Sequence, residues 1–276
     1  MRLIKQLVVV ALVALIGSQA VIAVNWNTPL TLVLGVATAV LSLFAYRWIV
    51  RRTEQRDPVE AARTGALGAL SRGLLIGFAM FGAVIVNIWF LGDYRVLGWG
   101  SLAGPVALIG FTAAAAVTDE LLFRGVLFRI IEERLGTWLS MLLTSLLFGL
   151  SHLFNPGATV WSALAIAIEA GGMLAAAYAA TRNLWVPNGL HFGWNFAEGA
   201  IFGTDISGKS APEGLLRGAL SGPTAISGGS FGPEASVYAL IAGVLVTIAF
   251  MWLARRRGRI VALRRTRAAA TATLVA

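Results

Sequence analysis

The sequence lacks cysteine and has little charge: none of its 276 residues is Cys, and only 13% are Asp, Glu, Lys or Arg. Without cysteine, disulfide bonds, thiolate catalysis, iron–sulfur clusters and cysteine-type zinc sites are excluded. A soluble domain would carry charge on roughly a quarter of its residues. Because 58% of the residues are hydrophobic, we expect a polytopic membrane protein.

The net charge of +9 is compatible with a nucleic-acid partner, but its distribution argues against one. The basic residues lie at the ends of apolar runs and in the C-terminal tail. In these places they orient a membrane protein and contact anionic lipid. We therefore expect the lipid bilayer as a partner, no nucleic acid, and localisation in the cell (cytoplasmic) membrane.

The hydrophobic residues form about eight runs, each close to the 17–25 residues that cross a bilayer. Eight crossings with both termini in the cytoplasm place nearly all Arg and Lys in cytoplasmic loops, in agreement with the positive-inside rule. A cleaved signal peptide is the alternative for the first run, but the second run follows it after only a few residues. The sequence predicts an all-α transmembrane helix bundle with spans at approximately 6–24, 29–50, 67–91, 104–134, 138–154, 160–180, 184–202 and 237–253.

No separate soluble domain is evident. Residues 1–260 are interpreted as one integral membrane domain with a motif-bearing core at 103–203, and 261–276 as a basic cytoplasmic tail that we expect to be disordered. A stretch rich in Gly, Ser and Pro, residues 203–233, is expected on the outer side. It could cover a site or serve as a linker.

The stretch TDELLFRG places Asp119, Glu120 and Arg124 inside an apolar run, where charges are costly and indicate a functional site. On a helix, Glu120 and Arg124 lie four residues apart on one face and can form an ion pair. Asp119 lies about 140° around the helix from Arg124. This geometry predicts a structural Glu120–Arg124 pair and leaves Asp119 free for chemistry. The alternative is that both acids only hold helices together.

The chain has only two histidines, and each lies in its own apolar run. Phe148 and His152 are four residues apart, and so are His191 and Asn195, so each pair shares a helix face. His152 is expected near the outer end of its run, and its convergence with the other residues therefore requires helix tilt or shifted helix ends. A further acid, Glu169, is either a partner of the site or a structural group.

A carboxylate and a histidine that converge on one water can remove its proton and direct it at a carbonyl. A second histidine and an asparagine amide can stabilise the resulting oxyanion. The predicted chemistry is peptide hydrolysis without a covalent intermediate and without a cofactor. Zinc held by His152, His191 and an acid is the alternative, ranked second because the sequence lacks HExxH.

Taken together, the motifs resemble those of the CPBP intramembrane proteases, which include the type II CAAX prenyl endopeptidases and bacterial relatives linked to bacteriocin processing and immunity. That family has two adjacent glutamates followed after three residues by arginine, then Phe-x-x-x-His, then His-x-x-x-Asn. Here these motifs read DELLFR from Asp119, FGLSH from Phe148 and HFGWN from His191. The resemblance covers residues from about 103 to 203.

The resemblance implies that Asp119 and His152 activate water and that His191 and Asn195 stabilise the oxyanion. The sequence departs from the family in one place, because the first acid is Asp rather than Glu. Either the helix lies closer to His152, or Glu120 takes the role, or activity is reduced or lost.

The predicted partner is a membrane protein or peptide substrate, for which processing near the C-terminus has a family precedent. Two other functions are weighed against an intramembrane endopeptidase. One is a catalytically silent relative that binds a membrane protein or serves as an immunity factor. The other is a small ion-coupled transporter with an acid–histidine relay.

Overall fold

Long apolar helices dominate the structure, a computed structural model that describes residues 1–263. The predicted all-α polytopic bundle is confirmed. Six helical runs in the described part are long and apolar enough to cross a membrane. They are α1 (Arg2–Ala23), α2 (Thr28–Glu54), α3 (Ala66–Phe90), the continuous run Ala103–Phe154, the run Val160–Thr181 and α10 (Val237–Arg256).

The count of six differs from the predicted eight for two physical reasons. First, the run Ala103–Phe154 has 52 residues, about 78 Å of helix, which is far longer than a bilayer is thick. It bends at Gly136, whose backbone is not helical (φ 73°, ψ 172°), and so contains two predicted spans. Second, α8 (Trp185–Phe196) has only 12 residues and is extended by a short π-helical turn, η5 (Ala197–Ile201).

Three π-helical turns interrupt the helices of the described region. In the first long run, α4 (Ala103–Glu120) passes through η2 (Leu121–Phe128) into α5 (Arg129–Ser151), which ends in the 3-10 turn η3 (His152–Phe154). In the second, α6 (Val160–Ile166) passes through η4 (Ala167–Gly172) into α7 (Met173–Thr181). The third turn is η5. Such turns shift the helix register by one residue and are common at functional sites.

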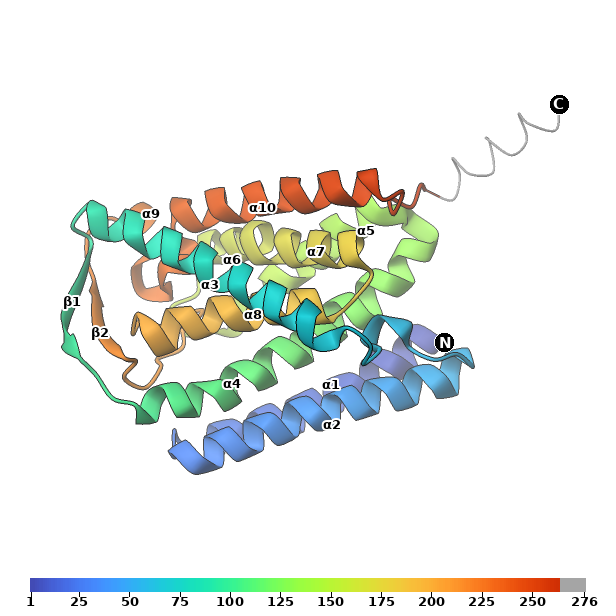
Figure 1. Cartoon of the computed structure of the whole chain (residues 1–276), viewed down its shortest axis with the longest axis horizontal. Helices are drawn as coiled ribbons and strands as arrows, with labels where there is room; N and C mark the ends of the chain where they lie inside the picture. Colours follow the sequence, from blue (N-terminus) through green and yellow to red (C-terminus); the bar gives the residue numbers. More distant parts are fainter. Residues whose placement is uncertain (264–276) are drawn as a thin grey trace.

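The N-terminus and the C-terminal end of α10 lie at the same end of the bundle (Figure 1). Arg2 forms ion pairs with Glu54 and Glu133 there, and the backbone N–H of Thr137 donates to the carbonyl of Val261 at 2.9 Å. Val261 is thus bonded into the bundle, and the rest of the predicted tail, from residue 264, lies outside the described residues. The gathering of basic residues at this end is the arrangement that the positive-inside rule predicts for the cytoplasmic side.

The opposite end carries the β-structure (Figure 1). Strand β1 (Tyr94–Trp99) pairs antiparallel with β2 (Leu216–Leu220), with Tyr94 opposite Leu220. The Gly-, Ser- and Pro-rich composition of residues 203–233 gives no indication of this strand pair. The segment 203–233 also contains α9 (Thr224–Ser227) and the 3-10 turn η6 (Gly229–Phe231), and η7 (Pro233–Ala235) leads into α10. Much of the predicted loop is therefore ordered and folded back on the bundle.

Small residues allow close helix contacts. A Cβ atom on Gly35 of α2 would lie 2.1 Å from the carbonyl oxygen of Gly110 in α4, and one on Gly110 would lie 2.3 Å from the carbonyl oxygen of Thr31. Backbones touch at these positions, as is usual where helices associate in lipid. This contact fixes α2 against the helix that carries the acidic motif.

Candidate active site

Glu120, at the end of α4, is the centre of the buried polar residues. Its Oε1 accepts a hydrogen bond from Arg124 Nη1 at 2.9 Å, and both side chains are almost fully buried, with 0% and 1% exposure. This is the ion pair that the four-residue spacing predicts. The same oxygen lies 3.1 Å from His191 Nδ1. Because a carboxylate can only accept, it orients the His191 ring with Nδ1 as the donor.

Arg124, on the π turn η2, has further contacts that fix its position. Its Nη2 donates to the carbonyl oxygen of Gly171 at 3.1 Å and to that of Ala170 at 3.3 Å, both on η4. Its guanidinium lies over the Phe148 ring, 4.7 Å from the centroid, where a cation–π interaction is favourable. Arg124 thus connects η2 with η4 and with the α5 helix that carries Phe148.

His152 follows α5 at the start of η3. Its Nδ1 lies 2.8 Å from the carbonyl oxygen of Phe148. A carbonyl only accepts, so Nδ1 carries the proton and Nε2 of the neutral ring is left as an acceptor. The Phe148 ring packs on both histidines, with centroids 4.7 Å from His152 and 6.1 Å from His191. The structure therefore brings the two predicted histidines to the same place.

A small cavity lies beside these rings. Its volume of ≈ 10 Å³ is about enough for one water molecule. The Asn195 side chain makes no hydrogen bond within residues 1–263 and is therefore available to a bound group. Polar and aromatic side chains from six segments line the cavity, and they include Phe148, His152, Glu169, His191, Trp194, Asn195, Ser207 and Glu234.

Asp119 does not line this cavity. It is half-buried and takes part in no ion pair with Arg124, which is paired with Glu120 instead. It is nevertheless near enough to both His152 and Arg124 for a direct electrostatic interaction. The first acid of the motif thus interacts electrostatically with His152 but does not belong to the cavity lining.

Within residues 1–263 there is no group of three or more His, Cys, Asp or Glu side chains that could jointly hold a metal ion. His191 uses Nδ1 on Glu120 and His152 uses Nδ1 on a backbone carbonyl. These contacts leave Nε2 of both histidines free, as is also usual for metal-ligating histidines, so the zinc alternative, His152 and His191 with an acid, stays a prediction.

The comparisons with known proteins concern this same region. The family described as type II CAAX prenyl endopeptidase Rce1-like matches residues 100–197, which include the acidic motif, both histidines and Asn195. The motif-bearing core is Rce1-like. The resemblance to the CPBP proteases is thereby confirmed, and the findings support an intramembrane protease in general and a multi-pass membrane protein.

One curated relative is similar over a longer stretch than the Rce1-like core. YdiL of Bacillus subtilis (strain 168), provisionally described as a membrane peptidase, is 23% identical over 171 residues, which are 57% of this chain and 68% of the relative. No solved structure matches the chain.

Several site residues outside or at the edge of the Rce1-like core were missed from the sequence. Glu234, in η7, accepts hydrogen bonds from Trp194 Nε1 at 3.1 Å and from Ser207 Oγ at 2.5 Å. It follows directly after the stretch 203–233 that was interpreted as a loop or linker, and no motif marks it. Through Ser207, which bonds to Glu234, the segment 203–233 reaches the cavity wall.

Two buried acids differ in how well they were anticipated. Glu169 lines the cavity, as one of its two interpretations required, and neither of its carboxylate oxygens has a hydrogen-bond partner within the described residues. Glu198 follows Asn195 by three residues, towards the outer end of its apolar run, and this position predicts a solvated acid; the prediction is wrong. It is fully buried, with 0% exposure, because η5 turns it inward and Gly232 of the outer segment covers it.

Proposed function

We propose that the protein is an intramembrane endopeptidase that hydrolyses a peptide bond with an activated water molecule. The observation that carries the proposal is the convergence of His152, His191 and Asn195 on one cavity about as large as a water molecule. Nothing in this arrangement requires a covalent intermediate or a cofactor. The Rce1-like core supports the same class of reaction.

In the proposed reaction, Nε2 of His152 accepts a proton from water, and Asp119 stabilises the imidazolium that forms. The water oxygen then bonds to the peptide carbonyl carbon, and the carbonyl becomes an oxyanion. The free amide of Asn195 and the imidazole of His191 stabilise that oxyanion. As the C–N bond breaks, the proton held by His152 passes to the leaving nitrogen.

The substrate that fits this proposal is a membrane protein or peptide that reaches the buried site from the bilayer, with cleavage near the C-terminus as one possibility. The cell membrane is the proposed location. We propose that residues 1–260 form one integral membrane domain.

A catalytically silent binding or immunity protein is the second candidate. One observation favours it: Asp119 replaces the family's glutamate and does not reach the cavity wall, and a misplacement of about 1 Å can be costly in catalysis. No observation in the described structure favours a transporter in the same way.

The test compares protein termini in membranes of cells that carry the wild type, Asp119→Asn or His152→Ala, by unbiased terminal-peptide mass spectrometry. The proposal expects a set of termini that disappears in both variants. Asp57→Asn is the matched control, because Asp57 is exposed and pairs only with the exposed Arg51. If no terminus depends on Asp119, His152 or, in a further variant, Glu120, the peptidase proposal fails and the binding protein is favoured.

A further inference from the structure

The π turn η2, which carries Arg124, is held by Tyr46, from outside the Rce1-like core, and by Arg129, whose own partners Glu54 and Gln6 lie outside that core. In η2 the backbone N–H of Arg129 donates to the carbonyls of Arg124 and Val126 and bypasses Gly125, its usual α-helical acceptor. The Gly125 carbonyl instead accepts from Arg129 Nε at 2.8 Å. The Tyr46 hydroxyl of α2 lies 3.1 Å from the same oxygen.

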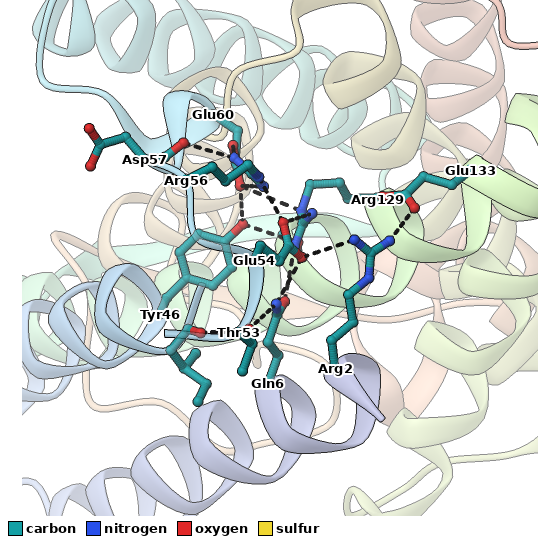
Figure 2. A network of polar contacts seen from close by, with 12 residues as sticks. Arg2, Gln6, Tyr46, Thr53, Glu54, Arg56, Asp57, Glu60, Arg129 and Glu133 are labelled. Carbon is teal, nitrogen blue, oxygen red and sulfur yellow. Dashed lines mark hydrogen bonds and ion pairs between the residues drawn. The ribbon is translucent and has the colours of Figure 1, made fainter. Parts of the chain in front are cut away.

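Arg129 is fixed by a fork of hydrogen bonds at the end of the bundle where the chain begins (Figure 2). Its Nη1 and Nη2 donate to the two carboxylate oxygens of Glu54 at 2.9 and 2.8 Å, and Nη2 also donates to Gln6 Oε1 at 2.9 Å. Such bidentate pairs determine direction as well as distance. Helices α1 and α2 therefore aim Arg129 Nε at the Gly125 carbonyl.

Tyr46 restrains the same backbone from a second side. Its hydroxyl lies 2.5 Å from Glu60 Oε1 as well as 3.1 Å from the Gly125 oxygen (Figure 2), so its single hydrogen is shared between two acceptors. Its ring packs directly on Gly125, where an added Cβ would lie 2.9 Å from a ring carbon. The backbone of η2 thus has almost no freedom to move towards α2.

From this turn the contacts continue to the cavity. Arg124 directly precedes Gly125 and pairs with Glu120. Glu120 in turn orients His191. We propose that Arg129 and Tyr46 are positioning residues for the active site: they fix the register of η2, and through Arg124 and Glu120 they set the orientation of His191. The effect on catalysis rests on the proposed peptidase function, whereas the effect on His191 does not.

The two histidines of the chain allow a direct test. Protein labelled with ¹⁵N-histidine in lipid bilayers gives only two sets of ring-nitrogen NMR signals, and the His191 Nδ1 signal reports its hydrogen bond to Glu120. The Glu120→Gln variant assigns that signal and defines the shift that the loss of the carboxylate charge causes. The test variants are Tyr46→Phe, which removes only the hydroxyl, and Arg129→Lys, which keeps the charge but cannot make the fork.

Matched controls come from the same chain. Tyr178→Phe removes a buried hydroxyl that makes no hydrogen bond within residues 1–263, beside Phe128. Arg182→Lys alters another half-buried arginine, which pairs with Glu132 at the same end of the bundle but not with η2. Both controls should leave the His191 signals unchanged.

The expected result is a shift of the His191 Nδ1 signal towards its Glu120→Gln position in both test variants, with the larger shift in Arg129→Lys. The rate at which Asp119-dependent termini appear should fall on the order of 10-fold in Tyr46→Phe and 100-fold in Arg129→Lys. Wild-type His191 signals in a folded Tyr46→Phe protein would overturn the proposal, even if Arg129→Lys fails to fold. Shifted signals in a protein without any termini that depend on Asp119, His152 or Glu120 would refute the peptidase function and leave the positioning role intact.

Discussion

His191 and Arg124 meet at one oxygen atom: Glu120 Oε1 lies 3.1 Å from His191 Nδ1 and 2.9 Å from Arg124 Nη1. A single carboxylate therefore neutralises a buried cation and orients an imidazole. The second acid of the motif holds the site together, while Asp119 remains outside this pair.

Replacement of Glu120 by Gln should destabilise the protein strongly, because it removes the carboxylate that forms the buried ion pair with the Arg124 guanidinium. Breaking a buried ion pair in this way costs about 3–5 kcal/mol. Unfolding of the purified protein in detergent, measured by heating, would show the loss. Glu133→Gln is the control, since its pair with Arg2 is half-exposed and worth at most about 1 kcal/mol; equal effects of the two changes would contradict the assigned role.

Alanine at Gly35 should force α2 away from α4. The added Cβ would lie 2.1 Å from the Gly110 carbonyl oxygen, and overpacking of this kind costs about 1–3 kcal/mol. The same unfolding measurement applies. Gly82→Ala serves as the comparison, because nothing lies within 4 Å of its added Cβ and alanine favours a helix. A Gly35→Ala protein as stable as Gly82→Ala would refute the close contact.

Glu60, in the loop segment η1 (Val59–Ala61) after α2, should make stability depend on acid pH. Burial opposes ionisation of its carboxyl, but hydrogen bonds from Arg56 and Tyr46 outweigh burial and lower its pKa below the ordinary 4.5. A carboxyl whose pKa is lower in the folded protein contributes stability above its unfolded pKa. That contribution is lost as the pH falls through the folded pKa.

The measurement is the melting temperature between pH 7 and pH 3. The wild type should lose stability below about pH 4.5, and Glu60→Gln should be less stable at pH 7 but decline less steeply in acid. Glu133→Gln should decline like the wild type. Parallel curves for Glu60→Gln and the wild type would show that Glu60 does not titrate in this window.

The outer segment 203–233 should open when Ser207 loses its hydroxyl. Ser207 Oγ donates to Glu234 at 2.5 Å, and a hydrogen bond to a charged group contributes about 1.5–3 kcal/mol. In proteoliposomes, Ser207→Ala should be cleaved faster in this segment by an added protease. Ser221→Ala, an exposed serine of the same segment, should be cleaved at the wild-type rate; faster cleavage of both variants would speak against the Ser207 contact.

The sequence predicted what depends on local spacing. The Glu120–Arg124 pair and the shared face of Phe148 and His152 follow from helix geometry alone, and the structure shows both. The all-α bundle followed from hydrophobic run lengths. The catalytic roles of Asp119, His152, His191 and Asn195 remain predictions, because their geometry fits the reaction but does not demonstrate it.

Contacts between segments that are far apart in the sequence could not be predicted from local spacing. Glu234 reaches the cavity because the outer segment folds back over α8, and Glu198 is buried because η5 turns it inward. Neither the position of Glu234 nor the burial of Glu198 is marked by a periodic pattern in the sequence. Tyr46 contacts the Gly125 carbonyl, which lacks its usual backbone donor because of the π turn η2. No characteristic residue composition marks a π turn in a sequence.

The three π turns have a consequence for chain length. A π turn holds one residue more than an α-helical turn, so a return to α geometry can absorb the removal of one residue from 121–128. The Gly125 carbonyl would then regain a backbone donor and would no longer depend on the Arg129 and Tyr46 side chains. Single-residue insertions and deletions in 121–128, 167–172 or 197–201 could therefore create or abolish a site of this kind while the bundle around it keeps its length and its span across the bilayer.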